Sequence, residues 1–147
     1  MWIIATELLI VCLVGVVLPA DAAGKATLKE QFGQEMKQVR EGSTSRIRNQ
    51  AAEDLALMAG KMKPDEIDDR AVTDLISLLD LQEDSMRYWI ARTLGNLGPR
   101  AKPAIPKLLG LLPEADCLEG SKTSASGIRF ALVQLGETPP PRPACNF

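Results

Sequence analysis

The stretch from Asp84 to Leu112 reads DSMRYWIARTLGNLGPRAKPAIPKLLGLL. Its apolar residues recur at helical spacing in two groups, one on each side of Gly98-Pro99, a pair that ends a helix. The first group is Met86, Ile90, Thr93, Leu94 and Leu97, and the second is Ile105, Leu108, Leu109, Leu111 and Leu112. Two such short helices are too apolar to stand alone. The spacing therefore predicts one unit of a stack of helix pairs.

A weaker copy of this unit precedes it, between Ser45 and Asp80. Its first helix aligns with the central unit at an offset of 39 residues and its second at an offset of 33, and the difference falls in the loop around residues 61–66, where helical repeats tolerate insertions. The aligned residues of this copy are Arg48, Ala51, Ala52, Leu55 and Met58, followed by Val72, Leu75, Ile76 and Leu79.

A third, partial copy follows the central unit. Ile128, Leu132 and Leu135 match Ile90, Leu94 and Leu97 at an offset of 38, but no second helix follows them. The chain instead runs through residues 137–147, whose prolines predict an extended tail. The Pro-x-x-Pro segment at 140–143 is compatible with recognition by an aromatic groove, although a spacer is the commoner role.

The central unit carries the pattern R-x-x-x-A-x-x-L-G-x-L-G-P from Arg87 to Pro99, followed by P-A-I-P-x-L-x-x-L-L from Pro103 to Leu112. This pattern resembles a HEAT-type helical repeat of the bacterial kind that also occurs in phycobilin lyases. The resemblance implies an α-α superhelix, a short HEAT/armadillo-like solenoid, whose usual work is to bind other proteins. It also implies that an arginine at the position of Arg87 pairs with a nearby acidic residue, for which Asp80 or Asp84 would serve.

The composition agrees with an all-α fold. Hydrophobic residues make up 46% of the 147 residues and aromatic ones only 4%, whereas strands favour β-branched and aromatic side chains. After residue 24 the chain has 17 basic and 17 acidic residues, so nothing indicates a nucleic-acid partner. The sequence contains no histidine, which excludes Ser-His-Asp and Cys-His catalysis in their usual form and histidine metal ligands.

Residues 1–22 are predicted to be a signal peptide. An apolar run extends from residue 8 to 18, and Ala20-Asp21-Ala22 fits the A-x-A pattern of signal peptidase sites. Because the segment before this run has no Lys or Arg, an uncleaved membrane anchor stays open as the alternative, although the run is short of the roughly twenty residues that span a bilayer. We expect export to the periplasm or the extracellular space, with no stable membrane anchor after cleavage.

Residues 23–44 are expected to form an N-terminal capping helix. Leu28, Phe32, Met36 and Val39 lie on one face of it and Gly42 ends it, while its remaining faces are charged. Residues 45–136 then hold the HEAT-like repeats, two full and one partial. The capping helix would cover the open apolar face of the first repeat, and its charged face is more simply a solvated surface than a binding site.

Cys117 and Cys145 are the two cysteines that remain after signal cleavage. In an exported chain two cysteines are more often joined than free, so we predict a disulfide that ties the tail to the loop after the central unit. The alternative is a pair of unpaired thiols.

An acidic cluster at Asp65, Glu66, Asp68 and Asp69 could suggest calcium, but the D-x-D-x-D-G order of a calcium loop is absent. Carboxylates at the first turn of a helix fit the cluster better, because they bind free backbone N–H groups there. We predict no metal, no cofactor and no catalytic residue. Ser and Thr residues between 121 and 126 are expected to belong to a linker.

Candidate partner-binding residues lie on two surfaces. Tyr88 falls almost opposite the apolar stripe of its helix, where an aromatic ring can anchor a partner; Trp89, nearer the stripe, is more often packing between repeats. A groove is expected along the second helix of each unit, lined by Thr73, Ser77, Lys107 and Gly110.

Three functions fit this sequence. The first is a non-enzymatic, exported scaffold that binds another protein of unknown identity. The second, from the resemblance, is an accessory or lyase-like subunit related to phycobilin lyases, which is weakened by the small size and the predicted export. The third is a structural envelope protein that associates with itself.

Overall fold

The computed structural model describes residues 26–118 and 123–145. The predicted signal peptide therefore lies outside the described residues, as does Phe147 at the end of the tail. The described ranges contain helices and no strand, which confirms the all-α prediction. No helix among them has the length and apolar content needed to cross a membrane.

Six α-helices and two 3-10 helices follow one another in the described ranges. They are α1 (Leu28–Glu41), α2 (Ser45–Ala59), η1 (Pro64–Glu66), α3 (Asp69–Leu78), α4 (Asp84–Asn96), η2 (Gly98–Ala104), α5 (Ile105–Ala115) and α6 (Ser124–Gln134). The central unit is thus α4 and α5, its weaker copy is α2 and α3, and the partial copy is α6 alone. Gly98, with φ of 60°, turns the chain after α4, as the Gly-Pro pair predicts.

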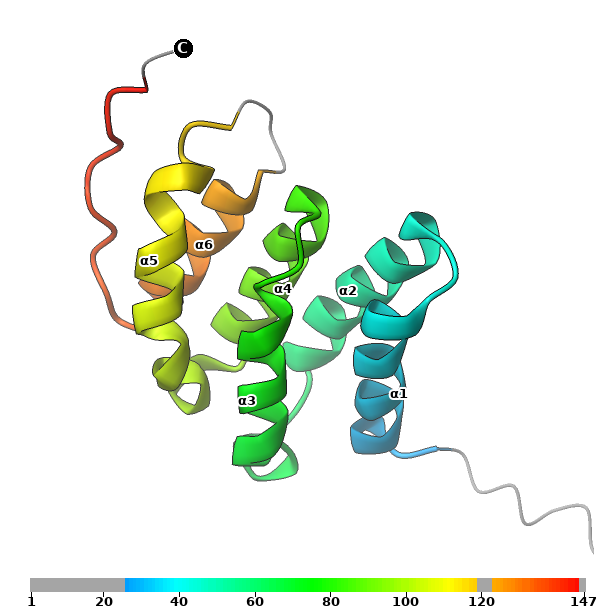
Figure 1. The fold of residues 1–147 in the computed structure, drawn as a ribbon. Helices are drawn as coiled ribbons and strands as arrows, with labels where there is room; N and C mark the ends of the chain where they lie inside the picture. Colours follow the sequence, from blue (N-terminus) through cyan, green and yellow to red (C-terminus); the bar gives the residue numbers. More distant parts are fainter. Residues whose placement is uncertain (1–25, 119–122, 146–147) are drawn as a thin grey trace, which may run out of the picture.

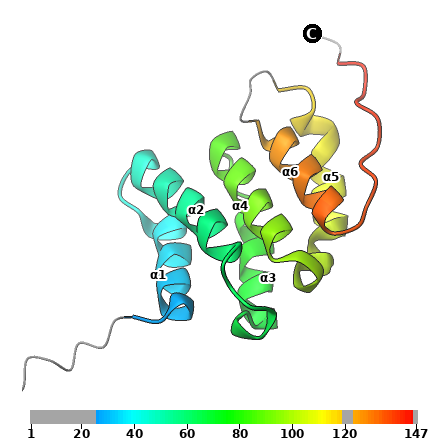
Figure 2. The same cartoon turned by 180° about the vertical axis from the view of Figure 1, so that it is seen from behind.

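The helices form two layers, as expected for a short helical solenoid. Figure 1 shows α1, α3 and α5 side by side in front, with α2, α4 and α6 behind them, and Figure 2 shows the same two layers from the other side. The predicted capping helix α1 thus stands in the layer of α3 and α5, the position that a second helix of a preceding unit would take. The stack consequently ends with a front-layer helix at the N-terminal side and a back-layer helix at the C-terminal side.

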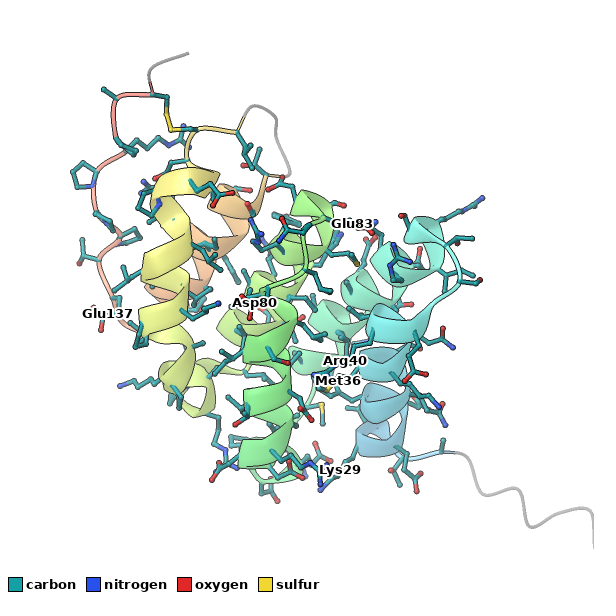
Figure 3. All side chains as sticks on the ribbon, viewed as in Figure 1. Lys29, Met36, Arg40, Asp80, Glu83 and Glu137 are labelled. Atoms are coloured by element: carbon teal, nitrogen blue, oxygen red, sulfur yellow. A yellow bond between two sulfur atoms is a disulfide. The ribbon has the colours of Figure 1, made fainter. Side chains whose placement is uncertain are left out.

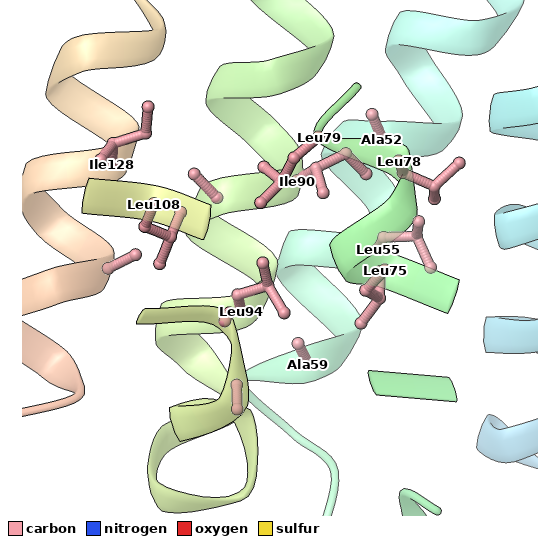
Figure 4. Close-up of a cluster of buried hydrophobic side chains, with 14 of the residues drawn as sticks. Ala52, Leu55, Ala59, Leu75, Leu78, Leu79, Ile90, Leu94, Leu108 and Ile128 are labelled. Atoms are coloured by element: carbon pink, nitrogen blue, oxygen red, sulfur yellow. The ribbon is translucent and has the colours of Figure 1, made fainter. Parts of the chain in front are cut away.

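The core fills the space between the two layers. Leu55, Leu75, Ile90, Leu94 and Leu108 are fully buried there and come from both layers (Figure 4). Of the predicted first stripe, Met86, Ile90, Thr93 and Leu94 are buried and Leu97 is partly buried. Burying a leucine or isoleucine side chain contributes roughly 1.5 to 3 kcal/mol, so these contacts carry much of the stability.

One residue of the predicted second stripe is exposed. Leu108 and Leu112 are buried, but Leu109 is 37% exposed. The buried face of α5 follows Leu108, Leu112 and Ala115, spaced four and three residues apart, and Leu109 lies about 100° away from Leu108 around the helix axis. Because α5 packs against α6 and η2 with one face only, a second row of leucines has no neighbour to cover it.

The back layer is the more closely packed of the two. Gly127 of α6 lies against the backbone of Tyr88 in α4, and Gly95 of α4 lies against Ala131 and the Phe130 ring of α6. A Cβ at either position would clash with the facing helix, so the two glycines allow α4 and α6 to approach closely. In the front layer α1 and α3 touch at few positions. The front helices are therefore spread apart, and space is left between α1 and α3.

The repeat-equivalent arginines do not bind alike. Arg48 donates to the carbonyl oxygen of Gly42 at 3.0 Å and forms an ion pair with Glu83. Arg87 is buried and donates to the carbonyl oxygens of Leu79 and Leu81, at 3.1 and 3.2 Å. The prediction that Arg87 pairs with Asp80 or Asp84 is thus wrong. Asp80 binds Lys107 instead, and Asp84 binds the backbone N–H and hydroxyl of Ser124.

Ser124 also corrects the expected linker. It is fully buried, and α6 begins there, because the Asp84 carboxylate accepts the free N–H at the helix start. Within the acidic cluster, Asp68 caps α3 by accepting the Ala71 N–H at 2.8 Å, as predicted, while Asp65 and Glu66 belong to the separate turn η1.

The tail runs extended from residue 137 to 145 along the outer side of α5 (Figures 1 and 2). The Cys117 and Cys145 sulfur atoms are bonded, which confirms the predicted disulfide. A second attachment was not predicted: Arg129 of α6 binds both carboxylate oxygens of Asp116, at 2.9 and 2.6 Å, and donates to the Pro140 carbonyl at 2.9 Å. The Asp116 side chain is 1% exposed. The tail thus runs beside α5, in the place that the missing second helix of the partial copy would take.

Candidate functional site

A groove opens between α1 and α3 in the front layer. Its volume is about 360 Å³, within the range of sites that hold small ligands or the side chains of a partner. The helices α1 and α3, together with the loop that precedes α3, supply its walls. The lining residues are Lys29, Phe32, Gly33, Met36, Lys37, Arg40, Glu41, Met62, Glu66, Ile67, Asp68, Arg70, Ala71 and Asp74.

The floor of the groove is apolar. Phe32 and Met36 of α1 are nearly buried, and Ile67 and Met62 approach from the loop before α3. Figure 3 shows Met36 pointing from α1 toward α3. Methionine side chains are flexible and polarizable, so a floor that contains two of them can adapt to apolar groups of different shape.

Ion pairs join α1 to α3 at the two ends of the groove. Lys29 Nζ lies 3.4 Å from the Asp68 carboxylate at one end. At the other end Arg40 donates to Ser77 Oγ at 2.8 Å and to the Asp74 carbonyl at 3.2 Å, and it lies 3.5 Å from the Asp74 carboxylate. Lys29 and Arg40 are eleven residues apart on α1 and both point toward α3 (Figure 3), so the groove is about 16 Å long.

The rim of the groove carries balanced charge. Four basic residues and four acidic residues line it, and several are already paired across or along the helices. The pKa of Asp68 is held below its ordinary value, first by the hydrogen bond from the Ala71 N–H and then by Lys29. The Asp68 carboxylate therefore stays ionised and its ion pair persists at neutral pH. The basic and acidic residues are Lys29, Lys37, Arg40, Arg70, Glu41, Glu66, Asp68 and Asp74.

The groove combines an apolar floor with a charged rim. It offers apolar surface flanked by ions of both signs, and the sequence supplies no histidine to act as a base. Over residues 26–118 and 123–145 no cluster of three potential metal-binding side chains occurs. An apolar side chain of a partner could fill the floor while polar groups of the same partner meet the rim.

The predicted groove residues lie in the same layer but outside this groove. Thr73 and Ser77 are exposed on α3; Thr73 donates to the Asp69 carbonyl at 2.9 Å, and Ser77 borders the groove only by accepting from Arg40. Lys107 of α5 is bound to Asp80, and Gly110 is exposed further along α5. None of these four residues lines the groove, and of the four only Ser77 contacts a residue that does.

The aromatic pair lies on the opposite layer. Tyr88 and Trp89 of α4 are both half-buried, and their rings meet edge to face with centroids 4.7 Å apart. Trp89 packs against the core, in keeping with its predicted packing role. Tyr88 is less exposed than its helical position predicts, because α6 approaches α4 so closely at Gly127.

Sequence reasoning missed the contribution of α1. The spacing of Phe32 and Met36 did predict an apolar face, but it was assigned entirely to covering the first repeat. The signal that could have indicated a groove is the charge pattern: Lys29 and Arg40 flank the apolar stripe of α1 and match acids near the start and middle of α3. Met62 could not be foreseen as lining, because it belongs to an insertion without repeat equivalents.

Comparison with known protein families matches residues 86–112, the α4–η2–α5 segment, to the PBS lyase HEAT-like repeat. The chain contains a HEAT-like repeat of the PBS lyase type. The matched residues are those of the central unit, and the two-layered stack of six helices is consistent with a short HEAT-like array. No curated protein and no solved structure matches the chain. The groove lies outside the matched HEAT-like repeat, on the side of the N-terminal helix.

Proposed function

We propose that this HEAT-like repeat protein is a non-enzymatic scaffold that binds another protein through the α1–α3 groove. One observation carries the proposal: α1 and α3 leave a groove between them with an apolar floor, and an ion pair joins the two helices at each end of it. Apolar cores with polar rims are the usual anatomy of protein interfaces. The lack of histidine in the sequence supports a binding role over catalysis.

The partner segment that fits has a defined character. A groove about 16 Å long suits two or three apolar side chains of a helix or a short extended segment. The rim residues without ion pairs to the rest of the described chain include Arg70 and Glu66, so the segment would carry charges of both signs beside its apolar anchors. We do not assign the groove to a cofactor.

We also propose that the protein works outside the cytoplasm. The Cys117–Cys145 bond supports this proposal, because disulfides persist in oxidising compartments and are rare in the cytosol. The apolar N-terminal segment with its Ala20-Asp21-Ala22 site supports it from the sequence.

A blocked groove tests the binding proposal. A Cβ at Gly33 would meet no atom within 4 Å, and Gly33 lines the groove, so Gly33→Trp should fill the groove without disturbing the fold. The tagged protein, expressed in its source organism, is purified after mild chemical cross-linking, and the proteins captured with it are quantified by mass spectrometry. A partner captured by the unaltered chain should be lost from Gly33→Trp.

Gly110→Trp is the matched control, because Gly110 is also open within 4 Å but lies on α5 outside the groove. It should retain the partner. If Gly110→Trp lost the partner and Gly33→Trp kept it, the binding surface would be the α3–α5 side instead. Capture that is equal for both variants and the parent would contradict a role for the groove.

A further inference from the structure

The Arg92 guanidinium of α4 makes cation–π contacts with two aromatic rings on the back layer. Its guanidinium carbon lies 4.1 Å from the centroid of the Phe130 ring and 5.7 Å from that of Tyr88. Phe130 is itself fixed, because its ring lies against α4 at Gly95, where a Cβ would come within 2.9 Å of it. These ring contacts favour one position of the Arg92 side chain in the absence of a partner.

The Arg92 guanidinium donates no hydrogen bond to any residue that the structure describes. Among the buried and half-buried arginines, Arg48, Arg87 and Arg129 each donate to a carboxylate or a backbone carbonyl. Arg92 is half-buried as well, yet within residues 26–118 and 123–145 it has cation–ring contacts and no such acceptor. Glu53 of α2, which aligns with Arg92 at the repeat offset of 39 residues, makes no ion pair with it.

This arrangement favours a carboxylate. A guanidinium whose face is covered by a ring presents its N–H groups at the edge, where a carboxylate can bind through two parallel hydrogen bonds. Stacking removes much of the rotamer freedom that a free arginine loses on binding, so the pairing costs less entropy.

Exposed apolar side chains lie on α2 and α6, the two helices that flank α4. Val133, 58% exposed, is three residues after Phe130 on the same face of α6. Leu57, also 58% exposed, follows Ala56 of α2, whose carbonyl accepts a hydrogen bond from Asn96 of α4. Arg and Tyr are among the residue types that contribute most to binding energy in protein interfaces.

We propose that Arg92, Tyr88, Phe130 and Val133 form a second docking surface, which binds an acidic segment of a partner protein. An Asp or Glu carboxylate of that segment pairs with the edge of the Arg92 guanidinium, and a neighbouring apolar side chain lies on Val133. This surface is in the back layer, apart from the α1–α3 groove, and the proposal does not depend on the groove.

A labelled peptide tests the proposal with the full chain. The probe is a fluorescein-labelled 12-residue peptide containing six glutamates and two leucines, titrated by fluorescence anisotropy at low salt; the same peptide with lysine for glutamate is the charge control. The acidic peptide should bind and the lysine peptide should not. Arg92→Gln should weaken binding at least tenfold. Arg92→Lys should weaken it to an intermediate degree, because lysine keeps the positive charge but lacks the paired N–H groups of the guanidinium.

Arg46→Gln is the matched control, since Arg46 is an exposed arginine of α2 away from Phe130, and its removal changes net charge equally. It should alter the affinity less than twofold, as should Gly33→Trp in the groove. The proposal is overturned if the acidic peptide does not bind, if Arg46→Gln and Arg92→Gln weaken binding equally, or if light scattering shows a dimer that Arg92→Gln dissociates, because a second copy would then occupy this face. Circular dichroism melts confirm that the compared variants are folded.

Discussion

Arg48 and Arg87 show what a repeat position specifies at the scale of a single residue. Each donates to a carbonyl at the end of the front-layer helix that precedes it, Gly42 after α1 and Leu79 after α3. Helix C-termini carry free carbonyls and a partial negative charge, so a cation there is stabilising. The remaining N–H groups find different acceptors: Glu83 for Arg48 and the Leu81 carbonyl for Arg87.

The Arg48–Glu83 pair leads to a prediction about pH. The Arg48 guanidinium, with smaller effects of Ser45 and Asn49, holds the pKa of Glu83 below its ordinary 4.5. Because the folded pKa is the lower one, the stability that this carboxylate adds is present above pH 4.5 and is lost as pH falls through the folded pKa. Glu83→Gln should therefore lower the melting temperature at pH 7, and the difference from the parent should shrink below pH 4.5.

Thermal melts at pH 7, 5 and 3.5 measure this difference. The control is Glu114→Gln, which removes an exposed carboxylate of α5 that forms no ion pair with the described residues. A Glu83→Gln penalty that is the same at all three pH values would show that the side chain acts through packing and not through its charge.

At the scale of elements, the close approach of α4 and α6 depends on Gly127. A Cβ there would lie 2.5 Å from the Tyr88 carbonyl oxygen and 3.0 Å from its Cα, both of them backbone atoms that cannot rotate away. Gly127→Ala should force the helices apart and lower the free energy of unfolding by about 1 to 3 kcal/mol, as overpacked cores do.

Gly33→Ala provides the opposite case within the same protein. Gly33 is in the middle of α1 with open space around it, so alanine should stabilise the protein by about 0.5 to 1 kcal/mol through helix propensity alone. Urea denaturation of both variants measures the two effects. Equal or reversed effects would contradict the close α4–α6 contact.

The elements differ in how far the sequence could predict them. The buried stripe of α4, the alignment of Leu55 and Leu132 with Leu94, and the alignment of Leu75 with Leu108 were predictable because helical periodicity and the repeat offsets agree. The exposure of Leu109 could not be predicted from the sequence. The residues of α5 are apolar on more than one side, and which side is buried depends on where the neighbouring helices lie. The groove escaped prediction for the same reason: it depends on how far α1 stands from α3.

At the scale of the molecule, the C-terminal end of the stack is closed by covalent and ionic attachment. The tail residues 137–144 are mostly exposed, so their packing contributes little. The Cys117–Cys145 bond and the hydrogen bond from Arg129 to the Pro140 carbonyl attach the tail, and the Asp116 carboxylate holds Arg129 in position. The disulfide was predictable from the count and position of cysteines. The Arg129–Asp116 pair was not, because it belongs to no recognisable motif and the residue that aligns with Arg129 in the central unit is Ala91.

Removing the disulfide should destabilise the protein without unfolding its N-terminal helices. The bond closes a loop with a sequence separation of 28 residues, which in the chain-entropy model is worth roughly 3 to 4 kcal/mol. The double variant Cys117→Ser/Cys145→Ser should melt at a lower temperature, and hydrogen exchange should become faster in α5 and α6 while α2 keeps its protection. Unchanged melting would mean that packing and the Arg129–Asp116 pair alone hold this end.

We propose that the α1–α3 groove is the surface through which this HEAT-like repeat protein binds a partner. Site-specific photo-cross-linking tests it most directly, with a benzophenone amino acid placed at Gly33, at Gly110 or at Val133 in cells of the source organism. Gly33 and Gly110 have room for it, and Val133 is exposed on the other layer. We predict a discrete cross-linked partner from Gly33 that is absent from Gly110. A partner cross-linked from Gly110 and not from Gly33 would contradict the claim.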